Sequence, residues 1–567
     1  MDRFDVVVVG AGPVGFTLAI DLGQRGIRTL LIEKDSTTKQ WPKMDRSNAR
    51  TMELYRRLGI AEQVRAVGYP PEASMDIFIA TRLCDPPLLQ LHYATVAEHR
   101  AKIAATTDTS EPREPYQLVA QNDLEPVLKR IAEATANVTV RFGCRLIDFE
   151  QDDNGVTVTL EDLDETHEVV RASFLAGCDG GISTVRKKLG IKLEGQGSLR
   201  QLRQITFRSE ELYDKIPIGK GRHYYLADAE GSALVVQGSR RDFTLNIAIN
   251  EGADLEQAVR DRVGFDFDFT IRNTTTWKLH LLLAERYRAG RVFLAGDAVH
   301  LVIPTGGLGM NTGIGDAIDL SWKLAGTIQG WGGPGLLDSY ETERRKVGAR
   351  NVEASRWAAQ GLAMWRELVT PGVYEDTPAA AELRARIGEA ANLHHRRVHE
   401  MIGVELGYSY AGSDLIAYED HNIADWDTTT YEPHTRPGVR VPHIWLADGR
   451  AMQDALGQDY TLIDLTGSAD TSAVEAEFER LGAPLDVLRV DDANVRAVYE
   501  CSLLLVRPDL HVFWRGDNLP GDLDHWAEQT VGHLTQVERD DKARAPAPPD
   551  MQPPSAISIV HCTLVCP

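Results

Sequence analysis

The sequence predicts an α/β fold with several domains. Three observations predict it: a β-branched apolar run that ends in glycine near the start of the chain, a helical apolar pattern directly after it, and a second glycine-rich strand end far downstream. The chain has 567 residues, which at roughly 150 residues per domain suffices for about three or four domains or an elaborated two-domain architecture. Its composition, 43% hydrophobic and 25% charged, excludes collagen-like, coiled-coil and wholly disordered chains.

The first unit of the chain is predicted to be strand, helix, strand. Residues 4–9 form a continuous β-branched run, which is typical of a strand covered on both faces. Apolar residues at 16–22 have helical spacing, Gly23 and Gly26 end that helix, and residues 29–32 predict a second strand. This βαβ order is typical of a Rossmann-like domain.

The turn of this unit has the glycine spacing of a dinucleotide-binding loop. Gly10, Gly12 and Gly15 allow a tight turn and a close approach of the backbone to a pyrophosphate at the helix N-terminus. Glu33, at the end of the second strand, can accept hydrogen bonds from ribose hydroxyls and would repel a 2′-phosphate. A glycine turn also serves plain strand–helix packing, but strand, spacing and acid together favour bound FAD or NAD over NADP.

A second glycine-rich segment favours FAD between these two. Residues 291–295 predict a buried strand, followed by Gly296, Asp297, Pro304 and the run GGLGMN at 306–311. A carboxylate at a strand end can accept hydrogen bonds from a polyol, and the N-terminus of the next helix can face a developing anion. The ribityl chain and the N1–C2=O edge of a flavin have these two needs.

With the Cys178-Asp179-Gly180 segment between them, these motifs resemble those of the single-component (class A) FAD-dependent aromatic hydroxylases. The resemblance is to the phenol hydroxylase and 3-(3-hydroxyphenyl)propionate hydroxylase branch of the para-hydroxybenzoate hydroxylase superfamily, and it is strongest over residues 3–350. It implies non-covalent FAD, NADPH or NADH as co-substrate, and O2. It also implies hydroxylation of a small phenolic or otherwise activated aromatic substrate through C4a-hydroperoxyflavin.

The resemblance also implies which residues bind the flavin. Gly10, Gly12, Pro13, Gly15, Glu33 and Lys34 would hold the AMP half, and Gly296 and Asp297 the ribityl chain, while Gly307, Gly309, Met310 and Asn311 would present backbone N–H groups to the pyrimidine edge. Arg46, Gln121, Asp179 and Gly180 would also reach FAD, and Asp179 and Arg186 would serve passage of the nicotinamide cofactor. Cap, turn or exposed-charge roles stay open for Arg46, Gln121, Asp179 and Asp297.

Residues 199–283 predict successive short strands, which suit a sheet forming the floor of a substrate pocket. The segments are RQITFRS, RHYYLAD, SALVVQGS, FTLNIAIN and TTTWKLHLLL. Strand alternation places His223 and Tyr225 on one face and Arg222 and Tyr224 on the other. His223 and Tyr225 are candidate catalytic residues, together with Pro304, whose counterpart in relatives presents its carbonyl to the substrate hydroxyl. Core packing of these aromatics and simple loop stiffening by Pro304 are the alternatives.

The predicted fold is therefore a glutathione-reductase-type FAD domain with an inserted β-sheet substrate domain and a thioredoxin-like C-terminal domain. Its parts are the FAD domain at 1–190 and 285–395, the substrate sheet at 191–284 with part of 70–118, a connection at 396–435, and the C-terminal domain at 436–538. That domain lacks the redox CxxC and is expected to be structural or a dimer interface. Residues 539–567 are expected to be mobile, or to add an edge strand at AISIVHCTLV.

Charge and cysteine content define the expected partners and compartment. Lys and Arg number 61 against 83 Asp and Glu, a net charge of −22, which disfavours nucleic acid and anionic membranes as partners. Six cysteines without a CxxC pair predict neither a disulfide scaffold nor a metal site. The N-terminal apolar run is too short for a signal peptide and no stretch has the length of a membrane span, so a cytoplasmic protein, and a homodimer, is expected.

Two other functions stay open at this point. Epoxidation or Baeyer–Villiger oxygenation of a polycyclic, polyketide-like aromatic would use the same fold elements. A non-catalytic flavin-binding interaction protein is the alternative from another class, although a pure scaffold has no need of both Asp297 and the Asp179 segment. The absence of a WxWxIP sequence disfavours a flavin halogenase.

Overall fold

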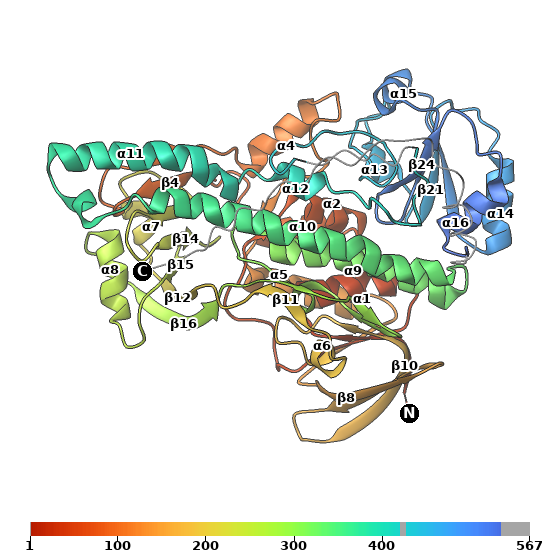
Figure 1. Cartoon of the computed structure of the whole chain (residues 1–567), viewed down its shortest axis with the longest axis horizontal. Coiled ribbons are helices and arrows are strands. Elements are labelled where there is room, and N and C mark those ends of the chain that lie inside the picture. Colours follow the sequence, from red (N-terminus) through yellow and green to blue (C-terminus); the bar gives the residue numbers. More distant parts are fainter. Residues whose placement is uncertain (1, 420–426, 535–567) are drawn as a thin grey trace, which may run out of the picture.

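A computed structural model describes residues 2–419 and 427–534 of the chain. Figure 1 shows a central α/β domain between a β-sheet domain at one end and a C-terminal α/β domain at the other, with the long helix α10 (Pro334–Arg366) running along all of them. The predicted mobility or edge strand of residues 539–567 lies outside the described residues.

The central domain is built on a sheet with strand order β18-β19-β10-β1-β2-β7, and β8 and β9 extend it from β10. Its parallel core aligns strand ends: Val9 pairs with both Ile32 and Gly177, and Gly177 pairs with Leu294. The four segments that follow these strands therefore leave the sheet at one edge. The strands are β1 (Arg3–Val9), β2 (Thr29–Glu33), β7 (Val138–Phe142), β8 (Arg145–Asp152), β9 (Gly155–Glu161), β10 (His167–Gly177), β18 (Arg288–Ala289) and β19 (Val292–Leu294).

Apolar helices cover this sheet. Helix α1 (Pro13–Gln24) packs against α5 (Gln121–Ala134) and α9 (Leu308–Gln329), and α9 packs against α10. The side chains of α1 from Phe16 to Leu22 are all buried, which explains why the predicted helix has so wide an apolar face. Among the described residues, no helix is both long and apolar enough to cross a membrane.

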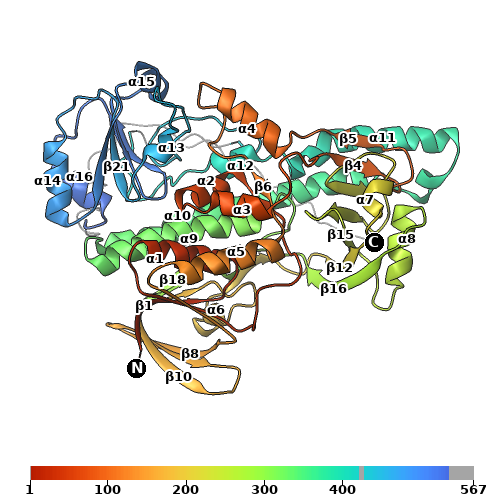
Figure 2. The same ribbon diagram turned by 180° about the vertical axis from the view of Figure 1, so that it is seen from behind.

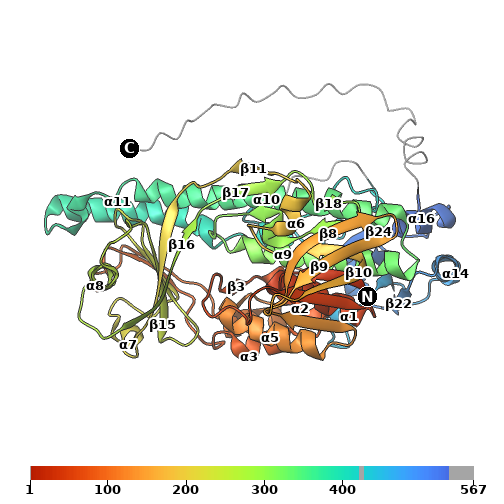
Figure 3. The ribbon, with the colours of Figure 1, turned by 90° about the horizontal axis from the view of Figure 1, so that it is seen from below.

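The second domain is a seven-stranded sheet with the order β16-β12-β15-β14-β13-β4-β5. Figure 3 labels its strands β15 and β16, at the end of the molecule away from the C-terminal domain. Strand β4 pairs in parallel with β13, so two strands from the first hundred residues complete a sheet formed mainly by residues 201–278. The strands are β4 (Ile77–Ala80), β5 (Leu89–Leu91), β12 (Gln201–Arg208), β13 (His223–Leu226), β14 (Ala233–Val236), β15 (Asp242–Ile247) and β16 (Thr270–Lys278).

Two features of this region were not part of the prediction of successive short strands over residues 199–283. Helix α8 (Leu255–Val263) lies between β15 and β16, because Asp254 caps its first turn and Gly264 ends it in the left-handed conformation. The segment TTTWKLHLLL, predicted as one strand, divides: β17 (Leu281–Ala284) leaves the large sheet and pairs with β11 (Leu193–Gln196) and β20 (His300–Leu301).

The C-terminal domain has the sheet order β22-β21-β23-β24. Figure 2 shows its strand β21 beside the helices α14 and α16. Strands β21 and β22 are parallel, and β23 and β24 are antiparallel to their neighbours. This order with its intervening helices is that of a thioredoxin fold and, with the FAD-type domain above, confirms the predicted fold class. Its elements are β21 (Tyr460–Asp464), α14 (Ser472–Leu481), β22 (Leu485–Arg489), α15 (Ala493–Tyr499), β23 (Leu503–Val506), β24 (Val512–Gly516) and α16 (Leu523–Thr530).

Candidate flavin and substrate site

The first glycine turn admits no side chain at two positions and leaves a third open. A Cβ on Gly10 would lie 2.5 Å from the carbonyl oxygen of Cys178, and one on Gly15 would lie 1.9 Å from that of Gly10. A Cβ on Gly12 would meet no protein atom within 4 Å. Gly12 is also the N-cap of α1, whose first turn has no side-chain cap and begins with Pro13. Its N–H groups can therefore bind an anion.

Glu33 is oriented toward this turn. Its Oε2 accepts a hydrogen bond from the backbone N–H of Ala11 at 2.9 Å, and its Oε1 accepts one from Asp35 at 3.1 Å. Lys34 beside it is exposed, and its ammonium pairs with Asp35 at 3.2 Å. Glu33 and the glycine turn thus form one edge, with Lys34 at its solvent side.

Asp297 leaves the same edge of the sheet one strand away. It lies in the short 3₁₀ turn η1 (Gly296–Ala298) after β19, and its Oδ1 is 4.0 Å from where a Cβ on Gly309 would stand. The carboxylate is exposed on one side, while burial by the surrounding atoms raises its pKa and His300 and Lys43 act in the opposite direction. The carboxylate therefore lies in a recess between η1 and the start of α9.

Helix α9 begins at this recess. Gly306 and Gly307 both have positive φ (88° and 67°), and Gly307 is an N-cap without a side-chain hydrogen bond. Gly309 and Met310, in the first turn, are half-buried. The Asn311 side chain is bonded to other residues: its Oδ1 accepts from Asn48 N–H at 2.9 Å, and its Nδ2 donates to the Arg46 carbonyl at 3.0 Å. Of Asn311, then, only the backbone N–H can serve a ligand.

Arg46 lies in the segment that precedes α2 (Ala49–Arg57), and the backbone N–H of Gln121 donates to the Met44 carbonyl of the same segment at 3.0 Å. A Cβ on Gly307 would be 3.4 Å from Cδ of Arg46, so Arg46 borders the start of α9. Its guanidinium pairs with Glu405 at 2.6 Å. Gln121 is buried and donates to Glu125 at 2.6 Å. Both side chains already have protein partners, which leaves their contact with a flavin a prediction.

The Asp179 segment lies between the two glycine segments. Asp179 Oδ2 accepts from the N–H groups of Thr184 and Val185 at 2.6 and 3.1 Å, while its Oδ1 is buried without a hydrogen-bond partner among the described residues. A Cβ on Gly180 would meet nothing within 4 Å. Arg186 is buried and donates to the carbonyls of Ala298 and Gly181 at 2.8 and 3.0 Å. It thereby joins this segment to η1, and its role in nicotinamide passage stays a prediction.

The candidate substrate residues lie on the sheet domain and beside α9. Pro304 is exposed, and its carbonyl accepts from Gly307 N–H at 3.0 Å. The rings of His223 and Tyr225 are 5.7 Å apart, whereas Tyr224 stacks on Phe78. Burial and the Arg222 charge lower the pKa of His223 to about 3, so its imidazole is neutral at pH 7, and burial raises the pKa of Tyr225 to about 12.

The sequence reasoning missed three neighbours of these residues. His395 and His399, at either end of η3 (His395–Val398), contact Tyr225 with ring centroids 4.2 and 6.1 Å away, and Tyr93 contacts His399 at 5.7 Å. The i, i+4 spacing of His395 and His399 within HHRRVHE was the one available signal, since that spacing puts two side chains on one helical face.

These features fit FAD. Two helix N-termini without side-chain caps, the open sides of Gly12 and Gly180, and the carboxylates of Glu33 and Asp297 meet along one sheet edge. A pyrophosphate, a ribose, a polyol and an electron-accepting ring edge require such partners in this order. The fold and this edge define a dinucleotide-binding flavoprotein.

Comparison with known proteins gives the family. Residues 3–355 match the FAD binding domain family, and residues 434–533 match the family of aromatic-ring hydroxylase C-terminal domains. The chain belongs to the FAD-dependent aromatic hydroxylases of the phenol hydroxylase type, which confirms the resemblance predicted from the motifs.

Relatives of similar length are hydroxylases and monooxygenases. Aklavinone 12-hydroxylase RdmE of Streptomyces purpurascens is 32% identical over 563 residues, covering 94% of this chain and 98% of that protein. The 2,4-dichlorophenol 6-monooxygenase of Cupriavidus pinatubonensis is 30% identical over 575 residues, covering 91% and 94%. The structure of chromopyrrolic acid-soaked RebC with bound 7-carboxy-K252c has a TM-score of 0.86, with 33% identity over 94% of this chain and 100% of that chain. The chain is thus a flavin-dependent aromatic monooxygenase, and the non-catalytic alternative loses its support.

A cavity of about 870 Å³ lies elsewhere, beside helix α8. Charged residues line it, among them Arg82, Asp228 and Arg260. None of its lining residues belongs to the flavin edge or to the residues around His223, so it has no part in the site described above.

Proposed function

We propose that the protein is an NAD(P)H:O2 monooxygenase that uses non-covalent FAD to hydroxylate a phenolic or other activated aromatic ring. The observation that carries the proposal is the meeting of the open glycine turn, Asp297 and the start of α9 at one sheet edge, next to a sheet that presents His223 and Tyr225. Bound FAD would supply the acceptance of hydride from NAD(P)H and the activation of O2.

The chain's own groups would bind and orient that cofactor. The N–H groups at the start of α1 would face the pyrophosphate, Glu33 would face the ribose, and Asp297 would face the ribityl chain. Backbone N–H groups from Gly307 to Asn311 would stabilise negative charge on the pyrimidine edge, because a helix N-terminus favours anions. Arg46, which borders the start of α9, would limit the side from which substrate can approach the flavin ring.

Substrate would bind between Pro304 and strand β13. The Pro304 carbonyl accepts one hydrogen bond from Gly307 and has a second lone pair for a substrate hydroxyl. Neutral His223 can accept a hydrogen bond from a phenolic hydroxyl, and Tyr225 can donate a hydrogen bond to a substrate oxygen. A hydrogen bond donated by the phenolic hydroxyl increases the electron density of the ring, as attack on an electrophilic oxygen requires.

The same site would also serve the second candidate, oxygenation of a polycyclic, polyketide-like aromatic. The name of the aklavinone hydroxylase relative favours it, and that of the dichlorophenol relative favours a single-ring phenol. We further propose that the protein is cytoplasmic, because the four described cysteines are free thiols, as in a reducing compartment. The homodimer expected from the sequence is part of the same proposal.

A substrate panel tests the function and separates the two candidates. The FAD-loaded protein is given NADH or NADPH with single-ring phenols in one arm and hydroxylated polycyclic aromatics in the other. We expect stimulated NAD(P)H oxidation and one added oxygen atom by mass in at least one arm. Oxidation of NAD(P)H that yields only hydrogen peroxide with every compound would contradict the proposal.

A further inference from the structure

Five aromatic side chains form a contiguous group between strand β13 and the η3 segment. The histidine pairs His223–His399 and His395–His399 have ring centroids 5.8 and 5.4 Å apart, and Tyr225 contacts all three imidazoles. We call this set the imidazole cluster; its members are Tyr93, His223, Tyr225, His395 and His399. Directly after it in the chain, Met401 packs on Gly306 and Leu308 at the start of α9. The cluster therefore borders the flavin edge.

The cluster holds several buried nitrogens without a hydrogen-bond partner. His395 is completely buried, and neither its Nδ1 nor its Nε2 has a partner among the described residues. The same is true of His223 Nδ1 and His399 Nε2. Because more than nine in ten buried polar groups in native proteins are hydrogen-bonded, four such atoms in one place require an explanation. A packed core would use hydrocarbon side chains here.

The imidazoles of the cluster are neutral. Burial and the charge of Arg222 lower the pKa of His223, and burial together with the neighbouring histidines and arginines lowers the pKa of both His395 and His399 well below its ordinary value. A neutral imidazole has one N–H donor and one acceptor nitrogen. Each of the three can therefore both give and accept a hydrogen bond.

The cluster does not have the geometry of a metal centre. Among residues 2–419 and 427–534, only Asp319, Glu343 and Asp509 place three candidate ligand atoms within 4.8 Å of one another. The three imidazoles are thus too far apart to share one ion. Organic oxygen atoms, which can be spread over a ring system, match them better.

We propose that the imidazole cluster binds the oxygen substituents of the aromatic substrate, and that this substrate carries at least two hydroxyl or keto oxygens. The inference rests on the proposed function and deepens it. A ring with a single hydroxyl can pair with at most two of the nitrogens, leaving the others buried and unpaired, and a site built to hydrogen-bond a substrate rejects analogues that lack the bonding groups. Half-buried His399 and Tyr93 lie where the ligand would enter.

Three ligands that differ only in hydroxyl number test this. Binding of naphthalene, 2-naphthol and 2,7-dihydroxynaphthalene to the FAD-loaded protein is measured by titration calorimetry. We expect the dihydroxy compound to bind at least about tenfold more tightly than 2-naphthol, as one added hydrogen bond allows. Equal affinities, or no detectable binding of the dihydroxy compound, would overturn the inference.

Variants identify the residues responsible. His395→Phe and His399→Phe keep a ring but lose the nitrogens, so each should reduce the preference for the dihydroxy compound to below about threefold. Thermal unfolding separates a structural role: removing unpaired buried nitrogens should leave the midpoint of His395→Phe unchanged or higher. His167→Phe, on an exposed position of β10, is the control and should match wild type. A lower midpoint with an unchanged preference would assign the cluster to packing and overturn the inference.

The outcomes also separate this inference from the proposed function. If the protein hydroxylates aromatic rings, but His395→Phe and His399→Phe leave its preference for the dihydroxy compound unchanged, only the role of the cluster is refuted. A protein that prefers the dihydroxy compound through His395 but oxygenates nothing refutes the monooxygenase proposal.

Discussion

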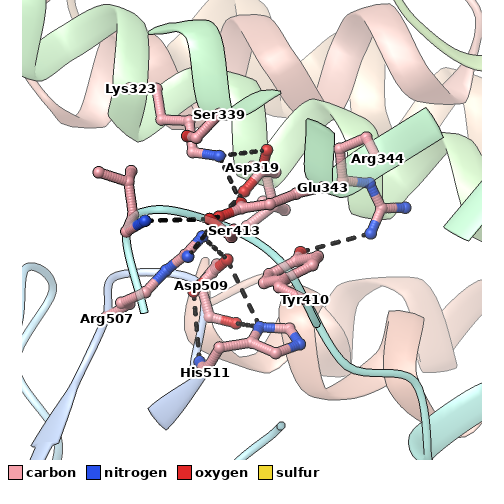
Figure 4. Close-up of polar contacts among 12 residues, drawn as sticks. Asp319, Lys323, Ser339, Glu343, Arg344, Tyr410, Ser413, Arg507, Asp509 and His511 are labelled. Carbon is pink, nitrogen blue, oxygen red and sulfur yellow. Dashed lines mark hydrogen bonds and ion pairs between the residues drawn. The ribbon is translucent and has the colours of Figure 1, made fainter. Parts of the chain in front are cut away.

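Arg507 donates hydrogen bonds to both carboxylate oxygens of Glu343, each at 2.8 Å, and both side chains are buried (Figure 4). Arg507 follows β23 in the C-terminal domain, while Glu343 belongs to α10. Lys323 of α9 joins the network through Asp319 and Glu343, at 2.8 and 2.5 Å. The C-terminal domain is thereby fixed to the two helices, and α9 is the helix that starts at the flavin edge.

Removing one side of this ion pair should destabilise the protein strongly. Arg507→Met leaves Glu343 buried beside a single cation, and breaking a buried pair costs about 3–5 kcal/mol. Equilibrium unfolding in urea measures the change. Arg480→Met, an exposed arginine on α14, is the matched control and should unfold as wild type does. If both variants unfold at the same urea concentration, the network does not join the domains.

The Glu53–Arg440 pair predicts a pH-dependent contribution to stability. Burial alone would raise the pKa of Glu53, but the guanidinium groups of Arg440 and Arg50 hold it below its ordinary value. A depressed carboxyl pKa stabilises the fold above the unfolded value of about 4.3, and that contribution is lost as the pH falls through the folded pKa.

The variant Glu53→Gln should therefore be less stable than wild type at pH 7. Its deficit in the free energy of unfolding should shrink as the pH is lowered below about 4, where wild type loses the contribution. Urea unfolding of both proteins at pH 7, 5 and 3.5 measures this. A deficit that stays constant across the series would mean that the charge of Glu53 contributes nothing.

Asp297→Ala should weaken FAD binding more than folding. It removes one charge-assisted acceptor, worth about 1.5–3 kcal/mol, which is roughly a ten- to hundredfold rise in Kd. Kd is measured by flavin fluorescence with deflavinated protein. Asp164→Ala, in the exposed turn before β10, serves as control. An unchanged Kd would leave Asp297 only the turn-forming role.

Gly12→Ala should separate cofactor binding from folding. Gly12 has φ −81°, which alanine adopts freely, and its Cβ would touch no protein atom. The methyl group would instead occupy the space in front of the α1 N-terminus, so FAD affinity should fall at least about tenfold while the apoprotein melts normally. Gly15→Ala, whose Cβ overlaps the Gly10 carbonyl, should impair folding itself. Normal FAD binding by Gly12→Ala would show that the pyrophosphate does not bind at this turn.

The glycine turn and the residues at strand ends could be predicted from the sequence, because short-range backbone contacts and strand order determine them. The contacts at Gly10 and Gly15 exclude every other residue, and strand ends of a parallel sheet meet at one edge, so Glu33 and Asp297 could be brought together from the sequence. Helix α8 was missed because it lies between the predicted strands FTLNIAIN and TTTWKLHLLL, in a stretch for which no element was predicted although Asp254 and Gly264 cap it.

The imidazole cluster could not be predicted as a group. His223 comes from a strand and His395 from a connection far along the chain, and only tertiary packing brings them together. For Asn311 the motif predicted only a backbone N–H contact with the flavin, and the structure adds a side-chain role: its amide joins α9 to the segment from Arg46 to Thr51. Sequence patterns locate backbone contacts better than the partners of long side chains.

The most direct test of the central claim is the origin of the oxygen in the product. The FAD-loaded protein is mixed with NAD(P)H and an aromatic compound that it hydroxylates, and is then exposed to ¹⁸O2 in ordinary water. The mass of the product is measured by mass spectrometry. The account predicts one ¹⁸O atom per hydroxylated ring. Product oxygen derived from water, or NAD(P)H consumed with no oxygenated aromatic formed, would contradict it.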